Sequence, residues 1–409
     1  MAQTGYVRAW HYLRAWHNDT CCTLGPLATH ALMAMKKRLI LVGPLPRNRI
    51  EGVSTSFRTL VTGLPQDDIA VINSNWMRDV KTPGRFNFLR AVESLGVILR
   101  VAIFMPRARS VYLIVASSRW GFLRDAVIVC ISSLFRRPVV GHLHGGGMRA
   151  FYVNSNKPLR WLIRQVYARI STIIVLGEEL RSQFRFVSKT TEIAVVPNGL
   201  PSDMEPDAFQ NRRLHSPVRL LYLSNITPSK GLGDLIEALA ILRRTIEVEL
   251  HVCGAFLSDV DGGSNKSGEQ FADRLRERIN ALQLNDSVIF YGTVLGAEKK
   301  EVFKNSDLLI LPTYYKWEGQ PICIIEAQAW SLPVVATDHR AIGDSVIFGK
   351  SAERCQPHQP YSIVEAVNKV VASPESYAEY TAAAFQNYSE FFRMDTHIQN
   401  MRNVIEEGS

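Results

Sequence analysis

The sequence has few cysteines, and their placement excludes several classes of protein. Six cysteines occur in 409 residues, and apart from the adjacent Cys21 and Cys22 they show no paired spacing. A disulfide framework or a zinc site would need such pairs, so we expect neither. This usage is typical of a reducing compartment and predicts a cytoplasmic location. A serine-hydrolase elbow, a Walker loop and a dinucleotide Gly-x-Gly-x-x-Gly are also missing.

Long apolar runs are absent as well. The most apolar stretch, Leu95 to Ser118, is interrupted by three arginines, Arg100, Arg107 and Arg109. A membrane-spanning helix needs about 20 apolar residues, so we expect no such helix here. We interpret the stretch as part of an amphipathic helix, Phe86 to Phe104, followed by a buried strand, Ser110 to Val115.

Residues 1–34 differ from the rest of the chain. They hold Trp10, Trp16 and three histidines without a clear period. They lack the basic start and sustained apolar core of a signal peptide. We predict a disordered extension and a folded protein that begins near Met33 or Met35. The alternative is an arm that touches a membrane.

Acidic residues are scarce in the first half. Residues 1–200 hold 27 Lys and Arg against 10 Asp and Glu, whereas residues 201–409 hold 20 against 28. A basic half predicts an acidic partner. Several arginines flank apolar stretches, namely Arg85, Arg90, Arg100, Arg107 and Arg109. They favour contact with an anionic membrane surface at the inner face of the cytoplasmic membrane, and the alternative is a basic face that is only solvated. We find no nucleic-acid-binding module and expect no nucleic-acid partner.

Short apolar runs alternate with helical stretches, which is the pattern of parallel α/β sheets. The predicted strands are 38–42, 69–72, 111–115, 139–142, 172–176 and 193–196, then 218–223, 247–252, 288–291, 308–311 and 334–336. The polar stretch 201–217 carries three prolines and predicts a linker. We therefore predict two Rossmann-like domains, residues 35–200 and 218–385, that face each other across a cleft. The final segment, residues 386–409, is predicted to pack as a helix on the first domain.

Two glutamates, Glu318 and Glu326, stand eight residues apart near the end of this series. Pro321 suits the first turn of a helix, so Glu318 lies in a loop and Glu326 inside an apolar helix. A carboxylate is costly to bury there without partners. Two acceptors beside free helix N–H groups fit a ligand rich in hydroxyls and phosphate. The alternative is a capping glutamate and a surface glutamate.

Two further segments follow predicted strands. Lys230, in the loop 224–231, precedes a helix that starts near Leu232, so an ammonium and backbone N–H groups point at one anion site. His144 is followed by three glycines, which permit close approach of a ligand. We expect His142 to point away, because neighbouring strand residues face opposite sides. The alternative for Lys230 is a solvated loop lysine, and the alternative for His144 is a histidine with a structural role only.

The segment 315–337 resembles the retaining glycosyltransferases of family 4, which have the GT-B fold. Their pattern is Glu, seven residues, Glu, a helix of small residues and a Pro-Val-Val strand, here Pro333-Val334-Val335. Ser331 stands where the family usually has Gly. Asn225 stands where it often has Arg, which puts a clamp of two cations in doubt.

The resemblance implies a role for each candidate residue. Glu318 contacts the hydroxyls of the donor sugar, helped by the residues after it. Glu326 holds the ribose, Lys230 the diphosphate, and His144 lies near sugar and acceptor. For Gly52 the alternative is a helix start, because its neighbour Ser54 suits a helix N-cap. For Asn198 the alternative is a simple Asn-Gly turn, which explains the sequence equally well. The remaining donor-binding candidates are Gly52, Asn198, Asn225, Val294, Gly319, Gln320 and Pro321.

The predicted function is transfer of a sugar from a nucleotide-sugar donor to a glycan or lipid-linked acceptor, with retention, in surface polysaccharide biosynthesis. No metal or other cofactor is expected, and Asp259-Val260-Asp261 is not taken as a metal motif. The alternatives are an epimerase or phosphorylase on the same fold, and a non-catalytic binding or scaffold protein. Asn225 favours the scaffold. The donor sugar, base, acceptor and oligomeric state stay open.

Overall fold

The computed structural model describes residues 38–46, 52–75, 88–188, 191–206, 208–257 and 268–408. Contacts group Arg38–Ser409 into one compact unit. The predicted extension, residues 1–34, and the segment Asp259–Asp261 lie outside the described residues.

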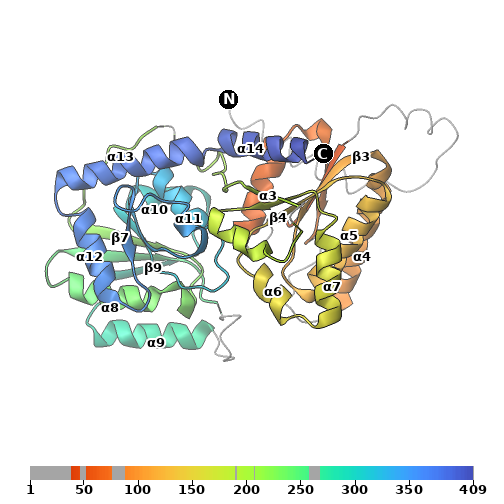
Figure 1. The fold of residues 1–409 in the computed structure, drawn as a ribbon. Helices are drawn as coiled ribbons and strands as arrows, with labels where there is room; N and C mark the ends of the chain where they lie inside the picture. The colour runs from red at the N-terminus through yellow and green to blue at the C-terminus, as the bar shows by residue number, and fades with distance from the viewer. Residues whose placement is uncertain are drawn as a thin grey trace. The chain divides into compact units, whose positions relative to one another are not determined.

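The first sheet contains six parallel strands in the order β2-β1-β3-β4-β5-β6. Figure 1 labels β3 and β4 of this sheet. They are β1 Arg38–Gly43, β2 Ile69–Asn73, β3 Ala108–Ile114, β4 Val139–Leu143, β5 Thr172–Val175 and β6 Glu192–Val195. Central strands such as β1 are nearly continuous apolar runs, as expected where both faces of a parallel sheet are covered. The sheet and its helices α3 to α7 are called the first domain below.

The second sheet is built in the same way, in the order β12-β11-β10-β7-β8-β9. Its strands are β7 Val218–Leu223, β8 Val248–Cys253, β9 Val288–Gly292, β10 Leu308–Leu311, β11 Val334–Thr337 and β12 Ala352–Cys355. This sheet with α8 to α13 is called the second domain. Two parallel sheets with helices confirm the predicted α/β fold.

Helices connect the strands in both domains. Those of the first domain are α3 Gly52–Gly63, α4 Phe88–Phe104, α5 Arg119–Leu134, α6 Met148–Asn154 and α7 Lys157–Tyr167. The others are α8 Leu232–Leu242, α9 Gly268–Ala281, α10 Gly296–Lys304, α11 Ile322–Ala329, α12 Pro360–Val370, α13 Pro374–Phe391 and α14 Met394–Glu407. Among the described helices, none has the length and apolarity needed to cross a membrane.

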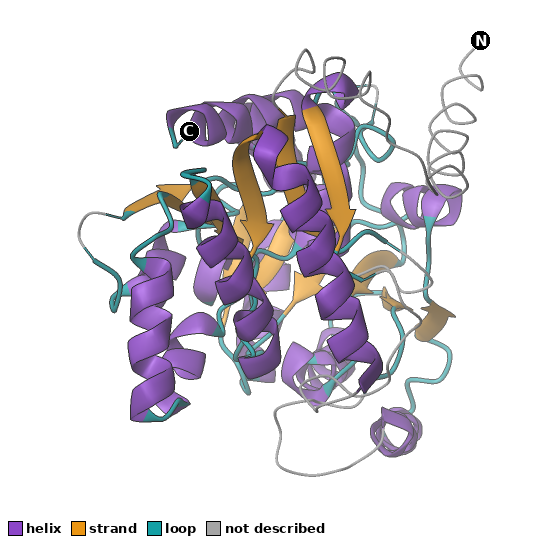
Figure 2. Cartoon of the chain, turned by 90° about the vertical axis from the view of Figure 1, so that its right-hand side faces the viewer, coloured by secondary structure: helices purple, strands orange, loops and turns teal. Residues whose placement is uncertain are grey.

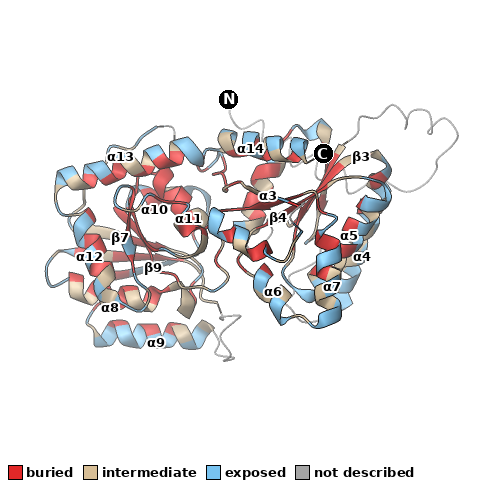
Figure 3. Cartoon of the chain, in the orientation of Figure 1, coloured by how far each residue is buried: buried red, intermediate tan, exposed pale blue. Residues whose placement is uncertain are grey.

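The sheets form the buried layer of each domain (Figure 3). In the first domain, α4, α5, α6 and α7 contribute to one core, and α3 contributes to a separate one. This second core also takes Ile398, Met401 and Ile405 from α14, which contacts α3. The last described helix therefore completes the core of the first domain.

The helix α13 was not predicted, and the predicted boundary at residues 385 and 386 falls inside it. Its buried face carries tyrosines with a threonine and an asparagine in place of large aliphatic residues, so the apolar period is hidden. The Tyr377 hydroxyl donates to the Asp307 carbonyl at 3.1 Å, and the Asn387 amide donates to Gln328 Oε1 at 2.7 Å. These bonds make burial of polar groups tolerable. The strand β12 and the helix α6 were missed as well.

The predicted linker, residues 201–217, is fastened to the second domain through Arg212. Its guanidinium donates to the carbonyls of Trp330, Ser306 and Phe303, each at 2.7 Å. Three carbonyl acceptors offset the cost of desolvating the guanidinium, whose pKa burial lowers. A polar side chain of this segment therefore anchors it to the second domain.

Candidate active site

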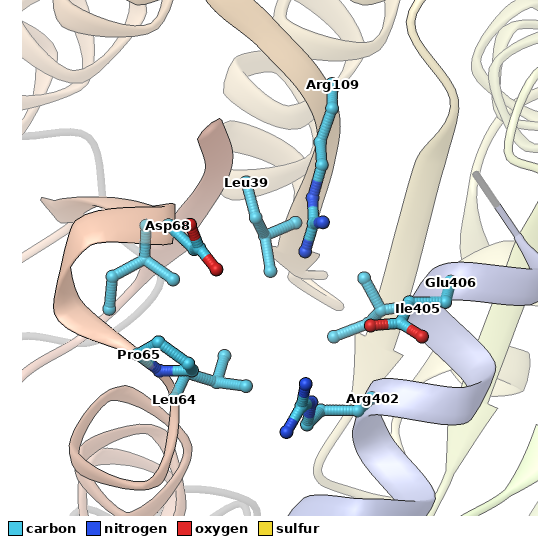
Figure 4. A pocket seen from close by; sticks show the side chains of 9 residues that line it. Leu39, Leu64, Pro65, Asp68, Arg109, Arg402, Ile405 and Glu406 are labelled. Atoms are coloured by element: carbon cyan, nitrogen blue, oxygen red, sulfur yellow. The ribbon is translucent and has the colours of Figure 1, made fainter. Parts of the chain in front are cut away.

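A small cavity in the first domain lies away from the predicted site residues. It measures about 40 Å³ and opens at the amino ends of β1, β2 and β3, beside α14. Figure 4 shows Arg109 and Arg402 extending towards it. Parallel α/β sheets bind ligands at the opposite, carboxyl ends of the strands. The candidate site is therefore built from the loops that follow β4, β7 and β10.

Glu318 lies in the loop 312–321, between β10 and α11, and is 6% exposed. Lys230 Nζ lies 2.9 Å from Glu318 Oε1 and 2.7 Å from Oε2. The hydroxyl of Thr313 donates to Oε2 at 2.9 Å. The sequence predicted Lys230 and Glu318 separately, and the structure brings them into one ion pair. This burial is not that of a surface glutamate, and no side chain makes a capping hydrogen bond to α11.

Close backbone contacts hold Lys230 in this place. The 3₁₀ turn η4, Pro228–Lys230, ends at Gly231, which has a φ of +79° and begins α8. A Cβ on Gly231 would lie 2.1 Å from the carbonyl oxygen of Pro312. Only glycine permits this conformation and this approach. The loop after β7 therefore abuts the loop after β10, and Lys230 meets Glu318.

Glu326 is 3% exposed on α11 and has a partner that the sequence analysis missed. Lys299 Nζ, on α10, lies 2.5 Å from Glu326 Oε1. Glu326 Oε2 is buried without a hydrogen-bond partner among the described residues. A buried carboxylate needs a nearby cation, and that need was the signal available. The sequence could not choose among Lys299, Lys300 and Lys304 on the same helix.

His144 follows β4, and its backbone touches the loop 312–321. A Cβ on Gly319 would lie 2.2 Å from the His144 carbonyl oxygen, so only glycine fits at position 319. The N–H of Gly146 donates to the carbonyl of Trp317 at 3.3 Å. His144 is thus placed next to the residues that follow Glu318.

The expectation that His142 points away from His144 is wrong. Their ring centroids lie 4.0 Å apart, because residues two apart in an extended chain face the same side. His142 Nδ1 is 2.6 Å from the Tyr112 hydroxyl. Burial, with a smaller effect of His397, lowers the pKa of His144 to about 3. Burial also lowers the pKa of His142 well below its usual value, so both rings are neutral at pH 7.

Asn198 and Gln320 form a polar link between the two domains. The N–H of Asn198 donates to Gln320 Oε1 at 2.7 Å, and Ser56 Oγ donates to Asn198 Oδ1 at 2.7 Å. Asn198 is 2% exposed, and its side-chain amide also donates to the Gln320 carbonyl at 3.5 Å, so it links the end of β6 to the loop 312–321. Gln320 Nε2 is buried without a partner among the described residues.

The other candidates lie around this centre. Gly52 begins α3, and a Cβ there would lie 3.7 Å from Ile322 Cδ1 at the start of α11. Pro321 is the N-cap of α11, one residue before the predicted first turn. Asn225 is exposed in the loop after β7, and Val294 is buried in the core of the second domain. No contact that the structure shows among the described residues joins these last two to Glu318.

Cys323, on α11, is a buried thiol close to both glutamates. Burial, then Glu326, raises its pKa to about 12, so it carries no thiolate at neutral pH. Among the described residues no cluster of three or more histidine, cysteine or acidic side chains could hold a metal ion. Among the described residues, the charged groups around the candidate site include two carboxylates, two ammonium groups and the Arg340 guanidinium beside Gly146.

Two family models match the chain, one in each domain. Residues 46–199 match the model described as "Glycosyl transferase 4-like domain", and residues 203–387 match "Glycosyl transferases group 1". The chain belongs to the family 4 glycosyltransferases. This confirms the resemblance inferred from Glu318, Glu326 and the strand after them.

Curated relatives are distant. Glycogen synthase of Mycobacterium tuberculosis is 26% identical over 236 residues, which cover 58% of this chain and 53% of the relative. An amylovoran biosynthesis glycosyltransferase of Erwinia amylovora is 27% identical over 175 residues, which cover 39% of this chain and 40% of the relative. The chain thus spans about half the length of the glycogen synthase it matches.

Solved structures share the GT-B fold over nearly the whole chain. Sucrose-phosphate synthase of Thermosynechococcus elongatus has a TM-score of 0.67 at 14% identity, and covers 90% of this chain and 98% of its own. HepE of Anabaena, solved in complex with UDP, has a TM-score of 0.65 at 17% identity. The match covers 90% of this chain and 100% of the HepE chain. At this identity the likeness concerns the fold alone.

Proposed function

We propose that the chain transfers a sugar from a nucleotide-sugar donor to a glycan or lipid-linked acceptor, with retention at the anomeric carbon. The observation that carries this proposal is the buried pair of Lys230 and Glu318 beside the start of α8. A cation, a carboxylate and free helix N–H groups together match a sugar diphosphate. Because HepE was solved with UDP, a uridine nucleotide is the first donor to test.

The proposed mechanism begins with an exchange of partners. A diphosphate at the amino end of α8 attracts Lys230, which releases the oxygens of Glu318 for hydroxyls of the donor sugar. Departure of the nucleoside diphosphate builds negative charge on the phosphates, and Lys230 with nearby N–H groups stabilises it. Glu326 Oε2, already without a hydrogen-bond partner among the described residues, accepts from a ribose hydroxyl.

We propose a front-face route for the transfer. A donor phosphate oxygen takes the acceptor proton, so no covalent intermediate with the protein forms. Neutral His144 accepts a hydrogen bond from a sugar hydroxyl but is too weak a base, with a pKa of about 3, to store the proton. Trapping a glycosyl adduct on a side chain would overturn this route.

Metal independence and a surface polysaccharide pathway belong to the same proposal. Lys230 supplies positive charge where a metal would otherwise neutralise the leaving group, so EDTA should leave the rate unchanged. A peripheral contact of the basic first half with an anionic membrane at the cytoplasmic face is also proposed, since lipid-linked acceptors lie in bilayers.

The decisive variant is Glu318→Gln, with Glu277→Gln as the matched control. Glu277 is exposed on α9, far along the chain from the site. Release of nucleoside diphosphate is measured with a panel of nucleotide sugars, with and without simple glycosides and polyprenyl-diphosphate sugars as acceptors. We expect Glu318→Gln to lose about 100-fold or more in rate, because it removes an interaction with the reacting sugar. Wild-type turnover in Glu318→Gln would refute the assignment.

The same assay separates the rival functions. Proton NMR of the product reports whether the anomeric configuration is retained. Turnover that requires inorganic phosphate identifies a phosphorylase, and conversion of the donor without acceptor to an isomeric sugar nucleotide identifies an epimerase. Nucleotide binding without turnover of any donor identifies a scaffold, against which the intact Lys230, Glu318 and Glu326 weigh.

A further inference from the structure

The helices α4, α5 and α7 cover one face of the first sheet, and their inner residues belong to one core. They face the viewer in Figure 2. Their outer face carries large apolar side chains. On α4 these are Phe88, Val92, Leu95, Leu99 and Ile103, of which Phe88 is 73% and Ile103 67% exposed.

This exposure follows one face of α4. Steps of four, three, four and four residues separate these side chains, so they form a stripe along the helix. Val127 and Leu134, seven residues apart on α5, and Trp161 on α7 are exposed as well. Monomeric proteins rarely expose apolar surface of this extent unless it meets a partner or a membrane.

The charge of these elements identifies the kind of partner. Together, α4, α5 and α7 contain seven Lys and Arg but only two acidic residues, Glu93 and Asp125. Asp125 is buried, and its carboxylate pairs with Arg124 at 2.7 Å. Exposed apolar groups among cations are typical of a helix that lies in the interface of an anionic bilayer. The net acidic second half would be repelled by the same surface, which orients the molecule.

The amino end of α5 lies beside the candidate active site. A Cβ on Gly147, in the loop after His144, would lie 3.0 Å from Ser117 Oγ, and Ser118 is the N-cap of α5. The helix α5 therefore starts beside the glycine loop that carries His144. A bilayer on α4 and α5 would bring membrane-bound sugars towards that end of α5.

We propose that the outer face of α4, α5 and α7 docks on an anionic phospholipid bilayer, with α4 lying in the plane of the headgroups. This inference rests on the proposed membrane contact and names the surface that makes it. The occupant is a lipid bilayer, and a second copy of the chain or a protein partner is an outcome that the experiment below distinguishes.

The test is co-sedimentation of the full chain with vesicles of phosphatidylcholine alone or with 30% phosphatidylglycerol. Leu95→Ser/Leu99→Ser changes two exposed residues of the stripe. The matched control, Tyr361→Ser/Phe391→Ser, changes two exposed apolar residues of the second domain, 69% and 47% exposed. A cooperative thermal transition followed by circular dichroism shows that each variant is folded, and donor turnover in solution, without vesicles, is measured separately.

We expect the wild type to bind the anionic vesicles at least tenfold more tightly than the neutral ones, with loss in 0.5 M salt. The Leu95/Leu99 variant should lose at least tenfold in binding, and the control should bind as the wild type does. Failure of the wild type to bind overturns the membrane contact, and equal binding to neutral vesicles overturns its anionic character. Unchanged binding of the Leu95/Leu99 variant overturns the assigned surface.

One other result also decides whether the stripe docks on a bilayer. A concentration-dependent dimer that the Leu95/Leu99 variant abolishes, without vesicle binding, assigns the stripe to a second copy of the chain and overturns the proposal. Because donor turnover is measured separately in solution, failure of vesicle binding leaves the proposed transfer untouched, and failure of turnover leaves the vesicle result interpretable.

Discussion

At the scale of single residues, each key carboxylate is matched by one lysine. Glu318 pairs with Lys230, and Glu326 pairs with Lys299. Both glutamates are nearly fully buried, so each lysine offsets the cost of keeping a charge out of water. These two pairs balance their own charges, and in the proposed mechanism a diphosphate disturbs this balance on the side of Lys230.

Lys299→Met should destabilise the fold and weaken nucleotide binding. Removing one partner of a buried ion pair typically costs about 3–5 kcal/mol, because the other charge stays buried alone. We expect a loss near the lower end, since the Lys299 side chain keeps 20% exposure. Urea unfolding and calorimetric titration with UDP measure the two effects, and Lys300→Met on the same helix is the control.

The double variant Lys299→Met/Glu326→Gln isolates the charge. It should recover most of the unfolding free energy, because no unpaired charge remains, but not the affinity for UDP, because the ribose acceptor is gone. Recovery of affinity would show that Glu326 does not hold the nucleotide.

The carboxylates and Lys230 could be predicted from sequence because spacing and context mark them. Lys299 could not, because three lysines share α10 and only the packing of that helix decides which one reaches α11. The position of His142 was predicted wrongly because the alternation of a strand was applied to residues two apart. The roles of these side chains in binding a donor stay predictions.

At the scale of elements, glycines set how closely the loops approach. The loop after β10 passes so near the loop after β4 that Gly319 has no room for a side chain. Sequence marked Gly319 only as a neighbour of Glu318, since steric contact between segments distant in sequence leaves no local signal. In the same way, α13 escaped prediction because hydroxyl and amide groups replace apolar ones on its buried face.

Gly319→Ala should separate these loops and lower turnover about tenfold or more. The added Cβ, 2.2 Å from the His144 carbonyl oxygen, must displace backbone that positions Glu318. Glu277→Gln, the exposed control on α9 that lies outside the candidate site, is again the control and should keep the wild-type rate. Equal rates in both variants would count against the role of the loop contact.

At the scale of the whole molecule, repeated βα units made the two-domain α/β fold predictable. Each sheet is a series of apolar runs that local pattern reveals, whereas the contacts between the domains come from isolated polar residues such as Asn198 and Gln320. Buried histidines make the stability of the whole fold depend on pH. Burial lowers the pKa of His397 to about 4, while its backbone partner Pro197 opposes the shift.

Stability should therefore fall as the pH drops from 7.5 to 5.0. Above pH 7, His397 is neutral in both states and contributes no difference. Below its unfolded pKa of about 6.5, the unfolded chain binds a proton that the folded chain does not, which favours unfolding. For His397 alone this amounts to about 2 kcal/mol at pH 5.0. Urea unfolding at both pH values should show a smaller drop in His397→Gln, and an equal drop would contradict this account.

The return of α14 to the first domain has a consequence for how the protein is made. On the ribosome, β1 to β6 emerge before the second domain, yet Ile398, Met401 and Ile405, which share a core with Leu39 and Phe57, are translated after it. The nascent first domain must wait through synthesis of the entire second domain with this core completed only by α3. Translation speed and chaperone capture during that interval, rather than the final free energy alone, then govern the yield of folded protein.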